Sequence, residues 1–341
     1  MRDRTITLAH GAGGRAMRAL IEELLLPAFG NTRADALEDQ ARMPIAELAR
    51  AGDRLAFTTD SYVVDPLFFP GGDIGALAAA GTVNDLAVGG ARPLFLSCGL
   101  VIEEGLPIAT LQDVAASMRR MADRAGVRLV TGDTKVVERG AADRLFINTS
   151  GIGVIPAGID LSASNAYPGD AVIVSGALGN HGVAILIARN QLALEADVAS
   201  DCQPLDGLVS ALLAACPTVH ALRDATRGGV ATVLNEFARA SNVAIRIGES
   251  AVPVCEPVRG ACEILGLDPL YLANEGVLVA VVPAADAARA LDAMRAHPAG
   301  ADAAIIGEVL RDPPGLVTMA THFGGERIVD VLTGEQLPRI C

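Results

Sequence analysis

The chain must build its hydrophobic cores almost entirely from small side chains. Apolar residues make up 51% of the sequence, yet aromatic residues make up only 3% and Trp is absent. Small apolar side chains suit close packing of helices on sheets. The 341 residues are enough for two domains of ordinary size. We therefore predict an α/β protein with more than one core.

Apolar periodicity predicts helices and strands in both halves of the chain. The first half should contain helices at 15–29 and 71–90, the second of which is unusually rich in Ala and Gly. The predicted strands are 54–59, 127–131, 145–155, 171–175, 243–247 and 277–282, and further helices are predicted at 205–215 and 229–240. Turn-forming residues fill the segment 156–170. We therefore expect domains at 1–156 and 157–311, followed by a C-terminal segment and tail at 312–341.

Charge and cysteine content exclude several classes of function. The net charge of −13 repels phosphate backbones, so we expect no nucleic-acid partner. No apolar run approaches the roughly 18 residues that span a bilayer, so we expect no membrane partner. The six cysteines form no CxxC pair, and their spacing fits neither a zinc site nor a disulfide framework. Free thiols indicate a reducing compartment, and we predict a cytoplasmic protein.

Four aspartates stand at the edges of apolar stretches rich in Gly, Thr or Asn. Asp60 closes one predicted strand, Asp133 follows another, and Asp85 and Asp224 lie in the segments GTVNDLAVGG and DATRGG. Carboxylates at the ends of strands can line a cleft, where they repel one another unless a cation lies between them. Mg²⁺ is commonly held by carboxylates and substrate phosphates together. The pattern favours a shared metal–phosphate site over four unrelated helix caps.

Glycine-rich segments before helices offer backbone N–H groups to a phosphate. The segment HGAGG precedes the first helix, and a Gly pair precedes the helix at 229–240. The GxxxxGK[ST] and GxGxxG signatures are absent, so any nucleotide site uses another architecture. A flexible chain start, a helix cap at Asp73 and a solvated face at Asn84 remain alternatives. The candidates for nucleotide contact are His10, Gly11, Gly13, Gly14, Asp73, Asn84, Asp133, Thr134, Arg227, Gly228 and Gly229.

The last residue of the chain is a cysteine. A terminal Cys is usually incidental, but the tail EQLPRIC is long enough to carry Cys341 into a cleft. Lys135 lies two residues beyond Asp133, and Glu275 lies in a loop before the strand at 277–282. A Lys and a Glu beside a metal site can move protons, although an exposed salt bridge is the commoner fate of such residues.

Together these motifs resemble the HypE family of hydrogenase maturation factors. The segments HGAGG, FTTDSYVVDPLFFPGGDIG, GTVNDLAVGGARP, LSCGL, VTGDTKVVERG, DATRGG, ANEG and the terminal PRIC occur in the family's order and cover nearly the whole chain. That family belongs to the PurM-like superfamily, with aminoimidazole ribonucleotide synthetase and selenophosphate synthetase. The resemblance implies an α/β fold with mixed sheets, in a two-domain PurM-like ATP-binding architecture with a flexible C-terminal tail. It also implies a homodimer paired through the N-terminal domains.

The resemblance further implies a reaction. The carbamoyltransferase HypF would load a carbamoyl group onto Cys341, and ATP would drive its dehydration to a thiocyanate. The HypC–HypD complex would then receive cyanide for the iron of [NiFe]-hydrogenase. Mg²⁺ would be held by Asp60, Asp85 and Asp224, and Glu275, then Lys135, would be the first candidates for proton transfer. The segment HGAGGR differs from the family's usual HGSGGK, which affects details of phosphate contact.

Two other functions remain compatible with the residues. One is a different PurM-like ATP enzyme, such as a selenophosphate-synthetase-like kinase, although residues 10–15 lack the Cys expected there. The other is a non-catalytic maturation adaptor whose tail docks a partner. An adaptor would consume no ATP and would not need the aspartates.

Overall fold

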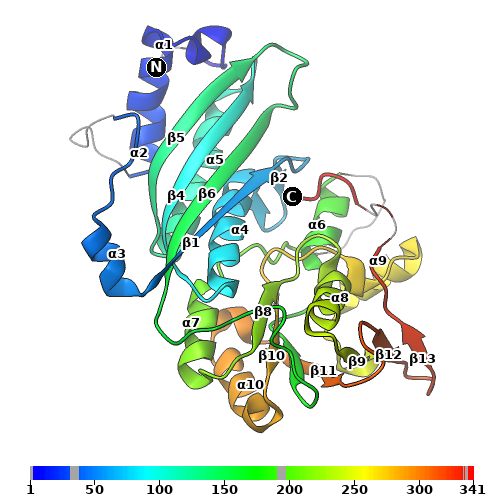
Figure 1. Ribbon diagram of the computed structural model, residues 1–341. Helices are drawn as coiled ribbons and strands as arrows, with labels where there is room; N and C mark the ends of the chain where they lie inside the picture. The colour runs from blue at the N-terminus through cyan, green and yellow to red at the C-terminus, as the bar shows by residue number, and fades with distance from the viewer. Residues whose placement is uncertain (1–2, 31–37, 190–196, 333, 335–336) are drawn as a thin grey trace.

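Two mixed sheets organise the chain into an N-terminal and a C-terminal half (Figure 1). The computed structural model describes residues 3–30, 38–189, 197–332, 334 and 337–341. Segment 156–170, rich in turn formers, connects the last strand of the first sheet to the first strand of the second. Across the described residues, no helix combines the length and apolar character that a membrane crossing needs.

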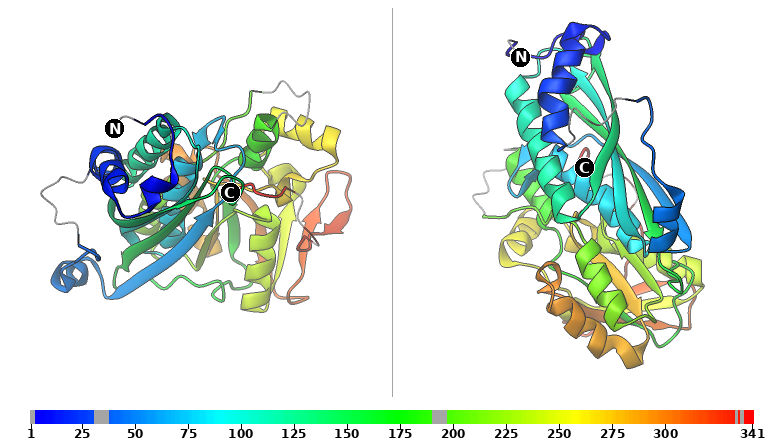
Figure 2. Two further views of the ribbon diagram at one scale, coloured as in Figure 1. Left: turned by 90° about the horizontal axis from the view of Figure 1, so that it is seen from above. Right: turned by 90° about the vertical axis from the view of Figure 1, so that its left-hand side faces the viewer.

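The N-terminal sheet has four strands in the order β1-β6-β4-β5. Strands β4 and β5 are parallel, and the other neighbours are antiparallel. The strands are β1 (Arg54–Tyr62), β4 (Arg92–Glu103), β5 (Arg128–Val137) and β6 (Leu145–Ile155). Helices α4 (Ile74–Val88) and α5 (Ile108–Arg124) cover one face of this sheet (Figure 2). Leu55 and Phe57 of β1 are exposed, and by the two-residue period of a strand they point away from these helices.

Helix α4 is rich in Ala and Gly because it is packed on nearly every side. All of its residues except Asp85 are buried. A Cβ atom on Gly81 would lie 2.3 Å from the Tyr62 hydroxyl, and one on Gly75 would lie 2.2 Å from the Val114 carbonyl oxygen. At the end of the helix, Ala87 and Val88 belong to a core cluster of the C-terminal half. Helix α4 therefore ties the two halves together.

The C-terminal sheet has seven strands in the order β13-β12-β9-β11-β7-β10-β8. Among the described strands of this sheet, β9 and β12 are the only parallel neighbours. The strands are β7 (Ala171–Val174), β8 (Ala221–Asp224), β9 (Ala244–Gly248), β10 (Leu278–Val282), β11 (Ala304–Leu310), β12 (Val317–Ala320) and β13 (Glu326–Ile328). Helices α7 (Asp206–Ala215) and α10 (Ala287–Arg295) cover one face, and α8 (Gly229–Ser241) covers the other.

Shorter elements complete the fold. The N-terminal ones are η1 (Leu8–Gly11), α1 (Arg15–Leu20), the π-helical η2 (Ile21–Leu25), α2 (Leu26–Ala28), α3 (Ile45–Ala51), β2 (Phe68–Phe69) and β3 (Gly72–Asp73). The C-terminal ones are α6 (Asn180–Ala188), η3 (Glu249–Ala251), α9 (Glu256–Leu265), η4 (Pro269–Tyr271), η5 (Ala284–Asp286) and η6 (Pro298–Gly300). Helix α6 contributes Ile185 to the N-terminal core, so it also lies at the junction of the halves.

Two strands are longer than the sequence predicted, which changes the setting of two aspartates. The predicted strand 54–59 continues to Tyr62 because Asp60 and Ser61 keep pairing with β6. The predicted strand 127–131 continues to Val137 because its residues keep pairing with β4. Asp60 and Asp133 therefore lie inside strands, and the prediction that they follow strand ends was wrong. The sequence patterns also did not predict β4, α6 or α9.

Candidate active site between the two sheets

Asp60 and Asp85 meet between β1 and α4. Each of the two carboxyl groups lies close enough to the other to influence its pKa. Thr58 Oγ1 donates to Asp85 Oδ2 at 2.7 Å, and the buried Tyr62 hydroxyl donates to Asp60 Oδ2 at 3.3 Å. Burial raises the pKa of both aspartates, against the lowering effect of these hydrogen bonds. The pair is thus a poorly solvated acidic site on the helix-covered face of the sheet.

Asp224 and Glu275 bring the C-terminal half to the same place. Burial, and then the nearby Asp85, raise the pKa of Asp224 to about 7. Glu275 is 3% exposed, and burial raises its pKa well above the usual range, with further upward effects from Asp201, Asp224 and Asp60. Its Oε1 atom has no hydrogen-bond partner among the described residues. These surroundings therefore disfavour the charged, deprotonated form of Glu275.

The backbone around Glu275 is held by two side chains from elsewhere in the fold. Asp201 accepts hydrogen bonds from the N–H groups of Glu275, at 3.2 Å, and Gly276, at 3.1 Å. From α4, Asn84 Nδ2 donates to the carbonyl oxygens of Glu275 at 3.3 Å and Gln203 at 3.1 Å. Asn84 Oδ1 accepts from the N–H of Leu205 at 2.8 Å. Asn84, the residue before Asp85, thus fixes the loop that carries Glu275.

These acidic residues suit a magnesium ion bound together with phosphates. Carboxylate oxygens are the hard ligands that Mg²⁺ prefers, and it usually takes one or two of them plus phosphates and water. Asp60 raises the pKa of Asp85, and Asp85 and Asp60 both raise the pKa of Asp224, as expected for carboxylates that share a site without a cation. Within the described residues, no group of three or more such side chains is arranged to hold a metal alone. The donor set fits Mg²⁺ only when a phosphate completes the coordination.

The C-terminal end of the chain lies at the junction of the halves. The Val63 N–H, just beyond β1, donates to the Cys341 carbonyl oxygen at 3.1 Å. Cys341 packs against the N-terminal core, which includes Tyr62 and Ala273. The tail was expected to be flexible, and in this structure its last residues are docked. Cys341 therefore packs on the core that also contains Tyr62, which contacts Asp60, and Ala273, which begins the ANEG loop.

A second group of predicted residues gathers at the other edge of the N-terminal sheet. Lys135 Nζ donates to Asp133 Oδ1 at 3.0 Å, and this interaction lowers the pKa of Asp133. The glycine-rich loop lies against the same strand, because a Cβ atom on Gly11 would lie 2.8 Å from the Val136 nitrogen. His10 is buried beside it, with Nε2 3.5 Å from Asp3 Oδ2. Gly13 and Gly14 follow in open space.

A cavity of about 590 Å³ adjoins this second group. Apolar side chains of α1, η2 and α2 form one wall. The other wall comes from β4, β5 and residues 38–43, with Gly132, Asp133 and Thr134 among the lining residues. Because the lining is mixed polar and apolar, the cavity suits a ligand with a flat apolar part and polar substituents.

Asp133 and Lys135 lie on the opposite face of the N-terminal sheet from the acidic pair. Asp60 faces α4, as its contact with Asp85 requires. On β5 the buried Thr134 faces the helices, so by strand alternation Asp133 and Lys135 face the opposite side. Both of these side chains are 64% exposed. Within one chain, Lys135 and the acidic cluster are therefore separated by the sheet.

Three other predicted contacts have structural explanations. Asp73 caps α4, accepting from the N–H groups of Gly75 at 2.7 Å and Ala76 at 3.1 Å, so the helix-cap alternative is the one observed. The amide of Asn84 is satisfied by backbone of the C-terminal half, so no ligand is needed to explain a polar group inside an apolar helix. Gly229 packs against backbone, since its Cβ atom would lie 2.4 Å from the Leu270 carbonyl oxygen.

Several residues of the site were not predicted from the sequence. Thr58 was predicted only as a strand residue and Tyr62 was given no role, although the hydroxyl groups of both donate to the acidic pair. Asp201 lies in a segment without a recognisable motif, and burial raises its pKa to about 6. Arg227 was predicted and does lie near Asp60 and Glu275, where its charge lowers their pKa values. Arg223, which does the same for Asp85 and Asp224, was not predicted.

Comparisons with known proteins agree with this architecture. Residues 38–155 match the family model for the N-terminal domain of AIR synthase related proteins, and residues 167–319 match the model for the C-terminal domain. The carbamoyl dehydratase HypE of Rhodobacter capsulatus is 57% identical, over 100% of this chain and 99% of that protein.

Solved structures agree as well. A crystal structure of the hydrogenase maturation protein HypE in complex with ATP matches with a TM-score of 0.93 and 49% identity, covering 99% of this chain and 100% of that one. A crystal structure of a HypE–HypF complex matches with a TM-score of 0.80 and 49% identity, covering 92% and 100% of the two chains. The chain therefore belongs to the HypE family of carbamoyl dehydratases and has the two-domain fold of AIR synthase related proteins.

Proposed function

We propose that this chain is an ATP-dependent carbamoyl dehydratase that converts a carbamoyl group on Cys341 into a thiocyanate for [NiFe]-hydrogenase maturation. Family membership supports the reaction class. The observation that carries the proposal is the docked position of Cys341, whose main-chain oxygen accepts from the Val63 N–H just beyond the strand that carries Asp60. The dehydratase explains why a carrier thiol and a phosphate-binding acidic cluster occur together, which a kinase or an adaptor does not.

Loss of water from a thiocarboxamide requires a better leaving group than hydroxide. The carbamoyl oxygen attacks the γ-phosphate of ATP, releasing ADP and forming a phosphorylated imidate on the Cys341 sulfur. Removal of the remaining N–H proton then expels phosphate and leaves S–C≡N. The balance is thiocarboxamide plus ATP giving thiocyanate, ADP, phosphate and one proton. The chain's task is to orient the groups, exclude water and accept protons.

Glu275 is the proposed proton acceptor, because it is buried and its loop is fixed by Asn84 and Asp201. Asp60, Asp85 and Asp224 are the proposed ligands of Mg²⁺. When bound, Mg²⁺ would neutralise phosphate charge and weaken the repulsion by Asp60 and Asp224 that raises the pKa of Glu275. Arg227 lies close enough to Asp60 and Glu275 to lower their pKa values, so it is also placed to contact a transferring phosphoryl group.

We further propose that two copies pair through the open face of the N-terminal sheet. Support comes from the exposed Leu55 and Phe57, which are 61% and 68% exposed on that face, since exposed apolar patches mark interaction sites. Pairing there would bring Lys135 of one copy toward the second copy. The glycine-rich loop and Asp133 with Thr134 would then hold nucleotide for a site completed across the dimer.

Mixed dimers test this arrangement. A Glu275→Gln copy paired with a Lys135→Ala copy would contain one site with both residues intact if Lys135 serves the other copy. Such mixtures should regain activity that neither variant has alone. No recovery in verified mixed dimers would show that Lys135 acts within its own chain or not at all.

HypF is the proposed source of the carbamoyl group, and the HypC–HypD complex is the proposed acceptor of cyanide. The HypE–HypF complex among the similar structures supports the first partner. The net charge of −13 and the lack of any CxxC pair among the cysteines support a cytoplasmic site of action without nucleic-acid or membrane partners.

Mass spectrometry tests the function directly. The purified chain is incubated with HypF, carbamoyl phosphate and ATP, and the C-terminal peptide is followed in time. Cys341 should first gain a carbamoyl group and then lose one water. The matched Cys341→Ala chain should show neither change. A wild-type chain that consumes ATP without modification of Cys341 would contradict the proposal.

A further inference from the structure

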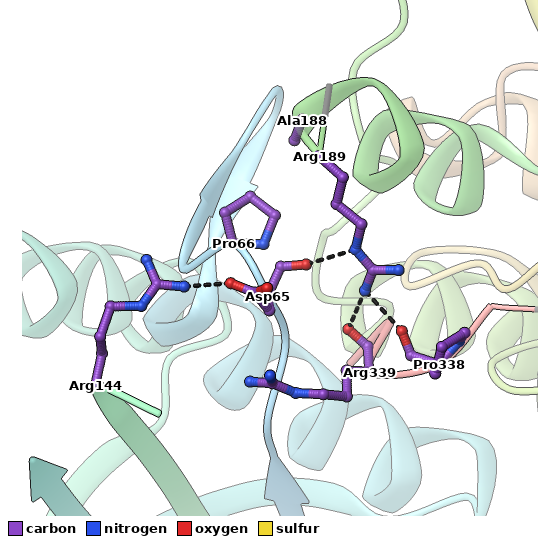
Figure 3. A pocket seen from close by; sticks show the side chains of 7 residues that line it. All are labelled: Asp65, Pro66, Arg144, Ala188, Arg189, Pro338 and Arg339. Carbon is purple, nitrogen blue, oxygen red and sulfur yellow. Dashed lines mark hydrogen bonds and ion pairs between the residues drawn. The ribbon is translucent and has the colours of Figure 1, made fainter. Parts of the chain in front are cut away.

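Helix α6 contacts the C-terminal tail at both of its ends. Near its first turn, His181 Nε2 lies 2.8 Å from the Ile340 carbonyl oxygen. Just after its last turn, Arg189 donates to the carbonyl oxygens of Pro338 at 2.6 Å and Arg339 at 2.8 Å (Figure 3). Every one of these contacts uses a main-chain carbonyl of the tail. The contacts from His181 and Arg189 therefore do not involve the tail's side chains, although Ile340 also packs its side chain in the N-terminal core.

The other side of the tail pairs with the segment after β1. The Val63 N–H donates to the Cys341 carbonyl oxygen at 3.1 Å, and the Asp65 N–H donates to the Arg339 carbonyl oxygen at 3.3 Å. This spacing is that of a short antiparallel strand pair. Arg189 Nε also donates to the Asp65 carbonyl oxygen at 2.8 Å, so one guanidinium holds both partners (Figure 3).

His181 is built to donate one hydrogen bond without carrying a charge. The ring is completely buried, and burial lowers its pKa to about 4. A carbonyl oxygen can only accept, so the proton lies on Nε2. Nδ1 is then the acceptor for Ser200 Oγ at 2.8 Å, and the ring edge packs on Phe69 with centroids 5.4 Å apart. The imidazole is therefore held in one orientation toward the tail.

The docked tail contains a strained residue. Arg339 has a φ of 54°, in the left-handed region that disfavours residues other than Gly. Its carbonyl is held by Arg189, and its side chain donates to the Val63 carbonyl oxygen at 3.1 Å and pairs with Asp143. The contacts offset the strain, so weakening them should favour an undocked tail.

We infer that His181 and Arg189 are positioning residues that dock the tail through its main chain and thereby hold Cys341 at the junction of the domains. The inference rests on the proposed carrier role of Cys341. Because His181 and Arg189 contact carbonyls of residues 338–340 and not the sulfur, the same dock accepts Cys341 as thiol, thiocarboxamide or thiocyanate. The dock thus fixes the reacting group through three chemical states.

The test compares two arginines of one cavity. Arg189 and Arg144 both line a cavity of about 440 Å³, but Arg144 pairs with the Asp65 carboxylate, whereas Arg189 holds the tail (Figure 3). Alkylation of Cys341 by N-ethylmaleimide, followed on the C-terminal peptide without ATP, reports how often the tail leaves. Arg189→Ala should raise the rate about tenfold, as expected for loss of charge-assisted hydrogen bonds. Arg144→Ala should stay within about twofold of wild type, a change too small to reflect such a bond.

Single-turnover dehydration supplies the second measurement. With Cys341 already carbamoylated, Arg189→Ala should lower the dehydration rate at saturating ATP and leave the KM for ATP unchanged. The dehydration rate of Arg189→Lys should lie between those of wild type and Arg189→Ala. A general loss of structure would instead lower the thermal midpoint and change both parameters. His181→Asn keeps a hydrogen-bond donor and should behave like Arg189→Lys. Because His181 is completely buried, this variant needs a check that its thermal midpoint is unchanged.

The outcomes separate the dock from the function. Wild-type alkylation rates in Arg189→Ala, or an equal rise in Arg144→Ala, would overturn the dock. Faster alkylation in Arg189→Ala together with a wild-type chain that never dehydrates Cys341 would support the dock and refute the proposed function.

Discussion

Aspartate has opposite properties in two regions of the molecule. In the acidic cluster between the sheets the pKa values of the aspartates are raised, whereas in the Asp133–Lys135 pair on the open face the pKa of the aspartate is lowered. Burial raises the pKa of Asp60, Asp85 and Asp224, and neighbouring carboxylates raise the pKa of Asp85 and Asp224 further. Asp133 is exposed, and Lys135 lowers its pKa. The first arrangement is costly unless a cation or substrate compensates it, and the second needs no ligand.

This contrast shows which of the predicted residues have an energetic cost that only a function would explain. A protein tolerates converging buried carboxylates where their function requires them. An exposed ion pair contributes about 0–1 kcal/mol and is common on any surface. In a single chain, chemistry is therefore expected at the cluster, and the exposed pair gains a role only if a second copy covers it.

Replacing the buried acid should have the largest effect. Glu275→Gln keeps the shape of the side chain but removes the proton acceptor, so the single-turnover dehydration rate should fall about 10²–10⁴-fold. ATP binding, measured by calorimetry, should remain. A fall of less than about threefold would exclude general base catalysis by Glu275.

Replacing a proposed metal ligand should have the next largest effect and should separate the two regions. Asp85→Asn should raise the Mg²⁺ concentration needed for half-maximal turnover by at least about tenfold. Even the loss of a residue that only hydrogen bonds to a metal ligand lowers metal affinity by about 10–100-fold, so the loss of a ligand should cost no less. Asp133→Asn should cost less, because its carboxylate is exposed and paired. A larger effect from Asp133→Asn would reverse the comparison.

Replacing the link between the domains should have a smaller effect. Asn84→Ala removes the acceptor of the Leu205 N–H and the donor to the Glu275 and Gln203 carbonyls, which should lower the free energy of unfolding by about 1–3 kcal/mol. Asn165→Ala removes an exposed amide that bonds to the Asp160 carbonyl and should change it by less than about 0.5 kcal/mol. Urea titrations measure both values. Equal values would mean that the interdomain amide contributes no special stability.

The general architecture could be predicted from sequence because it follows from periodicity and turn composition. Helix 71–90 and strands 145–155 and 277–282 were predicted close to their observed bounds. The ends of β1 and β5 were missed because polar residues continue the ladder there, and hydrogen-bonded pairing, which local sequence does not reveal, decides where a strand ends. Strand β4 was missed because its apolar residues do not alternate strictly with polar ones, so periodicity alone does not identify a strand there.

The candidate site was predictable in residue type but not in arrangement. Asp60, Asp85, Asp224 and Glu275 stood out through their motifs, and the fold brings them together. Which face Lys135 occupies depends on the register of β5, and a shift of one residue would reverse it. Asp201 and His181 act through contacts with backbone distant in sequence, so no local pattern marked them.

Oxygen transfer tests the central claim most directly. Cys341 is loaded with a carbamoyl group carrying ¹⁸O, one turnover is started with ATP, and the inorganic phosphate is analysed by mass spectrometry. The account predicts that the label moves into phosphate, and that in Glu275→Gln it stays on the protein. Label released into water, with unlabelled phosphate, would contradict attack of the carbamoyl oxygen on ATP.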